Sequence, residues 1–383
     1  MKTRRGMSQG VVIGAVVVVV ILVGAGAFYA GQASVSRATI TSTVTASGQG
    51  SSADQALYQL ALKEGSVTVY GTIDADQFAF YASAFNAAYP GINVQYTNVS
   101  PSQAYTKITT EISASGHSAD MITIDGLAPG LQNVGDITPY VAPGAANFPP
   151  AALDPSNSTT AILNLPQGCV YNTKLVPASQ VPKTLSDLTN PQWNGKMAMH
   201  DPTLGTGGTH YWATLSTILG NSTVNNFLTQ LKANVNPALI PSPGATESAV
   251  ASGEYAIACE VFLTDTVGDI LNNATVAPLP LQGVPLVTSP SQAAILKGAL
   301  HPNAAKLLID FLASPSGQAT IGDVTNIIPT SSPRIPINPN VQVPWSMASL
   351  ISKYDPGATV AYVPSTILLN SGSYQATYKS IFG

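Results

Sequence analysis

Charged side chains are scarce in this sequence of 383 residues, at 9% of all positions against about 25% in typical soluble domains. The 15 Lys and Arg residues are spread thinly, and the formal net charge is −4 at pH 7. Because binding to nucleic acid requires a basic patch that meets the phosphates, we set that class of function aside. The surface must be polar without being charged.

Cysteine and histidine are equally rare. Cys169 and Cys259 are the only cysteines, and in an exterior compartment we expect them to form a disulfide; two buried thiols are the alternative. The four histidines, at positions 117, 200, 210 and 301, lack the spacing of metal ligands and are expected in loops or on the surface. We therefore predict no metal site.

The motifs of common enzymes are also missing from the sequence. It contains no G-x-S-x-G elbow, no H-E-x-x-H, no P-loop and no C-x-x-C. We therefore predict no catalytic residue and no cofactor. An enzyme, such as a hydrolase, is the less favoured alternative.

A long apolar run stands near the N-terminus. The stretch from Val11 to Ala30 contains no charged residue, and as a helix it would be about 30 Å long, enough to cross a membrane. Three basic residues precede it, which favours a cytoplasmic N-terminus and an extracellular body. We predict a transmembrane helix over 7–32 that anchors the protein in the cytoplasmic membrane, at the cell surface. The alternative is a secretory signal cut near Ala25.

Residues 1–6 resemble a known type of leader. Arg5-Gly6 followed by Met7-Ser8-Gln9 is similar to the prepilin-type, or class III, leader of archaeal pilins and of some archaeal surface-binding proteins. The resemblance implies cleavage near Met7, with the helix kept as an anchor or as a means of self-assembly. Because pilins carry such leaders, a structural surface or pilus-associated protein is an alternative function.

A stalk and an exported body are expected beyond the helix. Residues 33–54 are rich in Ser, Thr and Gly and cannot bury a core of their own, so we predict a stalk. The body carries four N-glycosylation sequons, which agree with an exported glycoprotein, at Asn98, Asn157, Asn221 and Asn273.

From residue 55 onward, strands and helices alternate. Apolar runs at 67–70, 92–96 and 121–124 predict strands, and the spacing over 76–89 and 102–113 is typical of amphipathic helices. This alternation predicts an α/β fold with a mainly parallel sheet covered by helices on both faces. Ligands bind such sheets at the carboxyl ends of the strands. The candidate ligand-binding residues at these ends are Gly71, Thr72, Ile73, Asp125 and Gly126.

The pattern is interrupted twice, at 165–172 and at the Pro-rich and Gly-rich stretch 278–290. A separate series of strands and helices lies between these segments, so we predict that they are crossings between two lobes. Lobe 1 is then 55–166 plus 285–383, and lobe 2 is 167–284. The sequence suggests no function for 331–383.

The order of these segments resembles one family. The pieces that carry the resemblance are Val69-Tyr-Gly-Thr-Ile-Asp74, Phe85-Asn-Ala-Ala-Tyr-Pro-Gly-Ile-Asn-Val94, Gly168-Cys-Val-Tyr-Asn-Thr173, Pro182-Lys-Thr-Leu-Ser-Asp-Leu188, Trp193-Asn-Gly-Lys196, Gly298-Ala-Leu-His-Pro-Asn-Ala-Ala305 and Phe311-Leu-Ala-Ser-Pro-Ser-Gly-Gln318. Over roughly 65–329 the chain is similar to the extracellular solute-binding proteins of ABC importers, in the type II subgroup of ferric, polyamine, thiamine and phosphonate binders.

The resemblance implies a two-lobed type II periplasmic-binding-protein fold with a hinge of two crossings. The lobes would close over a small-molecule or ion ligand, which stabilises the closed form by its differential affinity. An ABC permease in the membrane would then be the partner that receives the solute.

Two segments of lobe 2 are further candidates for ligand binding. The first precedes a helix expected from Tyr211, where free N–H groups and hydroxyls could hold an anion, and where a histidine would add charge at acidic pH. Its residues are Thr206, Gly207, Gly208, Thr209 and His210. The second consists of Ser242 and Thr246, before a helix that includes 247–251. Ordinary capping turns are the alternative for both.

The ligand class stays open. Ferric binders of the subgroup usually present adjacent tyrosines after the strand that corresponds to 256–260, whereas this chain has Val261-Phe-Leu-Thr-Asp265. We therefore do not expect direct Fe(III) ligation by that pattern. The remaining ligands are an oxyanion, a phosphorylated or carboxylated compound, and chelated iron. A polyamine would require several carboxylates, for which Asp125, Glu260 and Asp265 are available.

Overall fold

The computed structural model describes residues 52–383 except 115, 117–118, 126–134 and 324–331. The predicted leader and transmembrane helix lie outside this range, and so does nearly all of the predicted stalk. No helix in the described part of the chain combines the length and apolarity needed to cross a membrane. The first helix, α1 (Ser52–Glu64), begins inside the segment predicted as stalk.

A first core gathers the elements from the beginning of the body and one later helical hairpin. These elements are α1, β1 (Ser66–Gly71), α2 (Ala75–Ala88), β2 (Asn93–Asn98), α3 (Pro101–Ser113), β3 (Met121–Asp125), β4 (Ile137–Thr138), α10 (Pro302–Ala313) and α11 (Pro315–Ile321). The strands and amphipathic helices predicted here are confirmed to within a few residues. Hydrophobic clusters lie on both faces of β1 and β3, so helices cover both sides of the sheet.

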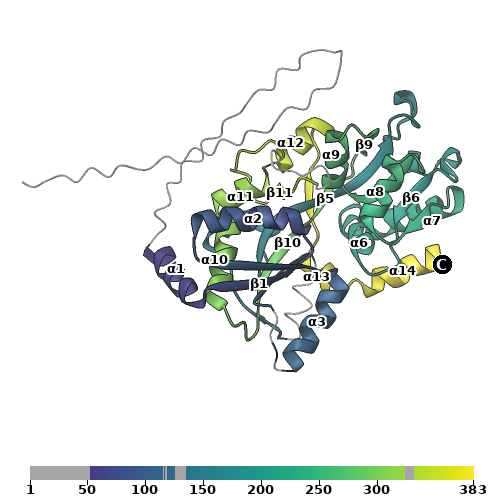
Figure 1. Cartoon of the computed structure of the whole chain (residues 1–383). Coiled ribbons are helices and arrows are strands. Elements are labelled where there is room, and N and C mark those ends of the chain that lie inside the picture. The colour runs from purple at the N-terminus through teal and green to yellow at the C-terminus, as the bar shows by residue number, and fades with distance from the viewer. Residues whose placement is uncertain (1–51, 115, 117–118, 126–134, 324–331) are drawn as a thin grey trace, which may run out of the picture. The chain divides into compact units, whose positions relative to one another are not determined.

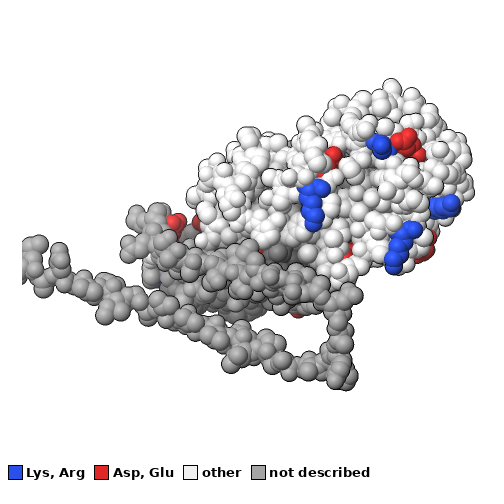
Figure 2. Space-filling view, turned by 90° about the horizontal axis from the view of Figure 1, so that it is seen from above, with Lys and Arg blue, Asp and Glu red and all other residues white. Residues whose placement is uncertain are grey.

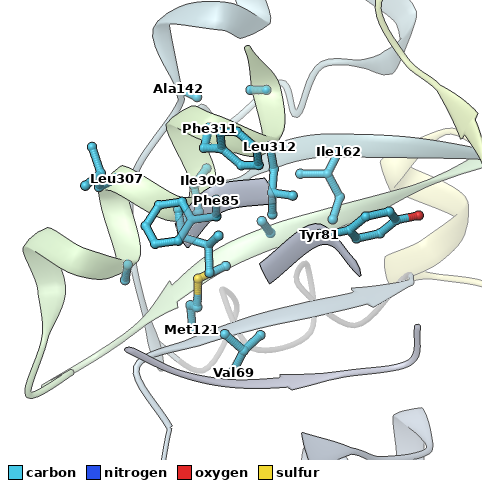
Figure 3. Packing of buried hydrophobic residues seen from close by; sticks show 14 of the residues in the cluster. Val69, Tyr81, Phe85, Met121, Ala142, Ile162, Leu307, Ile309, Phe311 and Leu312 are labelled. Atoms are coloured by element: carbon cyan, nitrogen blue, oxygen red, sulfur yellow. The ribbon is translucent and has the colours of Figure 1, made fainter. Parts of the chain in front are cut away.

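Aromatic and aliphatic side chains fill the larger part of this first core (Figure 3). Phe85 of α2 meets Phe311 of α10 edge to face, with ring centroids 5.7 Å apart. Met121 of β3 and Ile162 belong to the same cluster and are fully buried. Because full burial of such a side chain contributes about 1.5–3 kcal/mol, this cluster fixes α2 and α10 on the sheet.

A second core is built from the middle of the chain. Its elements are α5 (Leu185–Leu188), β6 (Met197–His200), α6 (Gly207–Leu219), α7 (Asn221–Asn234), β7 (Ala238–Ile240), α8 (Pro243–Ala251), β8 (Ile257–Phe262), α9 (Leu263–Leu271) and β9 (Val276–Leu279). Trp212 of α6 is fully buried against Tyr211 and Phe227. The two cores therefore have separate hydrophobic clusters.

Two long strands connect the cores. β5 (Thr160–Asn172) and β10 (Leu286–Leu296) pair antiparallel with each other and contribute side chains to both clusters. Both predicted crossings overlap these strands. Within the described residues the strands form one sheet, in the order β2-β1-β3-β10-β5-β8-β6-β7. The outer strands on each side pair in parallel, as predicted, whereas the crossing strands pair antiparallel with their neighbours.

The end of the chain corrects the predicted lobe boundary. Its elements are β11 (Ile335–Pro336), α12 (Met347–Tyr354), β12 (Val360–Tyr362), α13 (Ser365–Leu369) and α14 (Gly372–Phe382). Val363, Ile367, Tyr378 and Phe382 pack in the second core, beside Trp212. Assigning all of 285–383 to lobe 1 was therefore wrong for this terminal part, because its apolar side chains cover α6 and α7. In Figure 1, α14 lies beside these helices.

His301, expected as a loop residue before a helix, joins three elements of the first core. It is the N-cap residue of α10, and its ring Nδ1 lies 2.9 Å from Oδ2 of the buried Asp120. The same carboxylate accepts hydrogen bonds from the backbone N–H groups of Thr68 and His301, both at 2.8 Å. Ser66 completes a row of polar groups, with its Oγ 3.2 Å from His301 Nε2. Because the Asp120 carboxylate accepts hydrogen bonds from the backbone of both β1 and the start of α10, these polar contacts hold α10 against β1.

Candidate functional site

Helix N-termini gather at the carboxyl ends of the strands in each core. In the first core β1 leads into α2, and in the second core β6, β7 and β8 lead into α6, α8 and α9. Because β6 pairs in parallel with both β7 and β8, the three helices of the second core begin at the same edge of the sheet. Such edges are where α/β sheets bind ligands, and helix N-termini offer N–H groups to them.

The candidates of the first core lie on neighbouring strand ends. Gly71 has no room for a side chain, because an added Cβ would be 2.2 Å from Thr123 Oγ1 on β3. The carbonyl of Ile73 accepts hydrogen bonds from Tyr96 and from Asn98 Nδ2, the latter at 2.8 Å. The loop after β1 is therefore held in one conformation, with Thr72 donating its N–H to the Thr123 carbonyl.

Of the two remaining candidates in the first core, the structure describes only Asp125. Asp125 is the last residue of β3 and pairs with Ser291 of β10 in the sheet register, so it ends beside the loop that follows β1. Gly126 lies outside the described residues. The grouping of these strand ends agrees with the predicted site, and their contact with a ligand stays a prediction.

The glycines expected in a loop belong to α6 itself. The helix begins at Gly207 rather than at Tyr211, and Thr206 is its exposed N-cap residue. Gly208 packs on the end of β6, where an added Cβ would be 2.8 Å from the carbonyl oxygen of Asp201. Thr209 is fully buried, and its hydroxyl donates to the Pro202 carbonyl. Thr206 and the first N–H groups of α6 are thus better placed for a ligand than Thr209.

A buried ion pair that the sequence analysis did not predict lies beneath this helix. His200 Nδ1 at the end of β6 is paired with Oε2 of Glu260 on β8, and both side chains are almost completely buried. Burial raises the pKa of Glu260, and the hydrogen bond and charge of His200 oppose that shift. Glu260 also has a φ of 60°, a conformation that non-glycine residues adopt at a cost. The pair therefore fixes the ends of β6 and β8 under the first turn of α6.

His210 does not supply the positive charge that was expected at mildly acidic pH. Burial, and to a lesser degree the neighbouring His200, lowers its pKa from 6.5 to about 4. The side chain is neutral at pH 7 and stays neutral well below it. The prediction that His210 would assist anion binding in acid was therefore wrong above about pH 4, because the helix and sheet desolvate the ring.

This shift predicts a pH dependence of stability. In the unfolded chain the His210 side chain takes up a proton below about pH 6.5, whereas in the folded chain it does so only below about pH 4. Protonation therefore favours unfolding as the pH falls through this window, by up to about 3 kcal/mol. Urea unfolding of the wild type and of H210Q at pH 7 and pH 4.5 measures the effect. We expect the wild type to lose more stability than H210Q, and equal losses would contradict the assignment.

The hydroxyls of the second candidate segment cap α8. Ser242 Oγ accepts a hydrogen bond from the N–H of Ala245, and Thr246 donates its hydroxyl to the Ser242 carbonyl at 2.8 Å. Thr246 is fully buried. The capping alternative accounts for both side chains. A ligand at this segment would therefore contact backbone groups more readily than the two hydroxyls.

One arginine, also not predicted as a site residue, connects the two cores at this edge. Arg334 donates from Nε to Gln77 Oε1 of α2 at 3.0 Å. One terminal nitrogen lies 3.5 Å from Asp74 Oδ2, before α2, and the other lies 3.9 Å from Asp265 Oδ1 of α9. The N-terminus of α2 in the first core and that of α9 in the second therefore lie on either side of a single guanidinium.

A buried carboxyl group lies behind Asp265. Glu247 of α8 is 2% exposed, and burial, followed by the hydrogen bond to Asp269, raises its pKa to about 9. It is therefore protonated at pH 7. Burial also raises the pKa of the neighbouring Asp265, and the positive charge of Arg334 opposes that shift.

Two cavities elsewhere in the described part of the chain contain none of the candidate ligand-binding residues. A cavity of about 40 Å³ lies between β5, β9 and α12, lined by Gln167, Leu279 and Tyr354 among others. Another, of about 270 Å³, is lined by residues of the segment 141–161. Charged side chains are few and separated on the face shown in Figure 2. The strand ends with their helix N-termini therefore remain the best candidate site.

Comparison with known proteins identifies the class. Residues 70–319 match the family of bacterial extracellular solute-binding proteins, and the chain belongs to this family. This membership confirms the predicted solute-binding role and supports a binding protein rather than an enzyme. It also implies a location outside the cytoplasm, extracellular or periplasmic.

Solved structures share the fold at low sequence identity. Iron-bound HitA from Pseudomonas aeruginosa is 22% identical with a TM-score of 0.65, covering 82% of this chain and 99% of its own. AfuA from Actinobacillus pleuropneumoniae, solved with fructose-6-phosphate, is 19% identical with a TM-score of 0.65, covering 82% and 97%. A substrate-binding protein of an ABC transporter from Agrobacterium tumefaciens is 15% identical with a TM-score of 0.69, covering 83% and 94%. No curated protein matches this chain. These likenesses show the periplasmic-binding-protein fold.

Proposed function

We propose that the protein captures a small solute between its two cores and delivers it to an ABC permease. The observation that carries this proposal is the meeting of helix N-termini from both cores around Arg334, at the carboxyl ends of the strands. A solute bound there touches both cores, so it stabilises the arrangement in which they are close together. The permease then receives the solute from this closed form.

The long strands β5 and β10 are the proposed hinge. Each passes from one hydrophobic cluster to the other, and the chain passes between the clusters a third time between Ile337 and Val363. Small changes in backbone dihedrals near the middle of these strands would move one core relative to the other, as in hinge closure generally. Lobe 1 then consists of the first core, and lobe 2 consists of the second core with the terminal segment from 363.

The display of the protein at the cell surface is a further part of the proposal. The apolar stretch over 7–32 would anchor the chain in the membrane after cleavage of the class III leader, with glycans at the exposed sequons. Asn98, Asn157, Asn221 and Asn273 are all exposed, which an oligosaccharide requires. Self-assembly through the helix, and a structural or pilus-associated role, remain the alternative function.

For the solute, we propose an anionic or metal-chelate compound as the first class to examine. Free N–H groups at the start of α6 and the guanidinium of Arg334 can bind oxyanion, phosphoryl or carboxylate groups. HitA is described with iron, and AfuA with fructose-6-phosphate. The described residues offer no cluster of three or more His, Cys, Asp or Glu side chains for a bare metal ion.

Native mass spectrometry of the full chain, isolated from cells that express it, tests the proposal. We expect one small molecule per chain, released unchanged on denaturation. In G208A the added Cβ meets the backbone of Asp201 at 2.8 Å, so α6 must move from β6 and the bound solute should be lost. The matched control is G116A after α3, at the opposite end of the sheet, where the nearest atom is 3.8 Å away.

Several outcomes would contradict the proposal. They are a wild-type chain that is isolated empty, a solute that is chemically converted, or equal loss of solute from G208A and G116A. Filaments formed by the purified chain without any bound solute would favour the structural alternative.

A further inference from the structure

Arg334 reaches helices that belong to different hydrophobic clusters. Asp74 and Gln77 stand at the start of α2, whose Phe78 and Tyr81 are buried in the first core. Asp265 stands in the first turn of α9, whose residues pack with the second core. β11, which follows Arg334 directly, lies between these two helices (Figure 1).

The backbone that carries the arginine is fixed to both sides. Gln77 Nε2 donates to the carbonyl of Ser332 at 3.0 Å, while its Oε1 accepts from the guanidinium. On the other side α9 approaches closely, since a Cβ added to Gly268 would be 3.4 Å from Ser332 Cα. After the arginine, Ile335 pairs with Asn164 of β5. The guanidinium is therefore held in place rather than free to follow one helix.

The positive charge of Arg334 lies between two carboxylates, those of Asp74 and Asp265. The arginine side chain is 11% exposed, Asp265 is 26% exposed and Asp74 is 57% exposed. The contacts to the carboxylates, at 3.5 and 3.9 Å, are longer than those of a bidentate ion pair. Asp269 and the neutral Glu247 are the other carboxyl groups close to Asp265. A shared, partly hydrated contact of this kind can break and form again as the cores move apart and together.

We propose that Arg334 is a tie between the lobes that favours the closed arrangement before any solute binds. This inference rests on the proposed function, because it concerns the opening of the same site. If the binding-competent closed form is partly populated in advance, the apparent dissociation constant rises in proportion when that population falls. Loss of the tie should therefore open the lobes even when no solute is present, and this opening, measured without solute, is what separates the tie from any direct contact of the guanidinium with the solute.

The tie also makes closure dependent on salt. The Debye length is about 3 Å at 1 M salt and about 30 Å at 0.01 M, and the contact to Asp74, which is 57% exposed, is the one that salt weakens most. Raising the salt concentration should therefore separate the two cores in the wild type. The same change should have little effect on a chain that lacks the guanidinium.

Hydrogen exchange and small-angle X-ray scattering of the full chain in mild detergent test the tie. Compared with the wild type, we expect R334Q to show faster exchange in the first turns of α2 and α9. The radius of gyration of R334Q in the absence of solute should also be larger than that of the wild type. The matched control is K353Q, which removes one positive charge from α12. R334K keeps the charge but not the planar guanidinium, so its exchange rates and radius of gyration should lie between those of R334Q and those of the wild type.

The result that would overturn the proposal is an R334Q chain with the wild-type exchange pattern and radius of gyration. Should R334Q fail to fold, the wild type at low and high salt, together with D265N, gives the same comparison. Wild-type dimensions that do not change with salt or in D265N would then contradict the tie. An R334Q chain that opens yet still carries a solute supports both the tie and the proposed function. An R334Q chain that stays closed and carries a solute refutes the tie but leaves the proposed function intact.

Discussion

Replacing His200 with alanine is expected to lower the free energy of unfolding by about 3–5 kcal/mol. The substitution leaves the fully buried Glu260 carboxyl without the imidazole that pairs with it. Because burial already raises the pKa of Glu260, the lost pairing leaves that carboxyl protonated in the folded state at higher pH. The unfolded chain ionises freely above the ordinary pKa, so H200A should lose further stability as the pH rises. Urea unfolding at pH 5 and pH 8 measures both effects.

A double variant separates the ion pair from simple packing. In H200L/E260L both polar side chains are gone, so no buried carboxyl group is left without a partner. We expect this variant to be more stable than H200A, in keeping with the general behaviour of buried pairs. The ion pair would not hold β6 to β8 if H200A were as stable as the wild type. The same conclusion would follow if H200A and the double variant lost equal amounts of stability.

Removing the disulfide should have an effect of similar size. Cys169 of β5 and Cys259 of β8 are bonded and stand opposite each other in the antiparallel register, 90 residues apart in the sequence. A crosslink across so long a loop restricts the unfolded chain, and its loss is expected to cost about 3–4 kcal/mol. Urea unfolding of C169A/C259A against the wild type, both without reductant, gives the value from the shift of the midpoint.

The single variant C169A is the control for the volume change. It breaks the same crosslink but keeps the Cys259 side chain, so its stability should lie close to that of the double variant. If either variant unfolded within about 1 kcal/mol of the wild type, the crosslink would not stabilise the attachment of β5 to the second core.

Elements with a strong local pattern could be predicted from the sequence. The stripe of Phe78, Tyr81 and Phe85 gives the correct helix because its spacing follows the helical period. The beginning of α6 was placed late, because glycine is a poor helix former and Gly207 and Gly208 read as a loop. Tertiary packing of Gly208 on the end of β6 overrides that preference.

Contacts between distant segments could not be predicted. His200 and Glu260 meet only because β6 and β8 are neighbours in the sheet, and a single sequence does not give strand order. Arg334 and Gln77 are 257 residues apart, and the arginine follows a segment with no regular apolar period. A Glu within an otherwise apolar strand was the local signal that a buried polar pair was present. The strand end at Gly71 was reached by the rule for α/β sheets, which needs only the order of elements. Thr206 was reached because a Gly-rich segment before a helix can hold an anion.

Hydrogen exchange of the full chain with and without its co-isolated solute tests the central claim most directly. If the solute lies between the two cores, amides at the N-terminus of α2 and at the N-terminus of α6 should both exchange more slowly when it is bound. Protection confined to one core, or to residues away from the strand ends, would contradict the account.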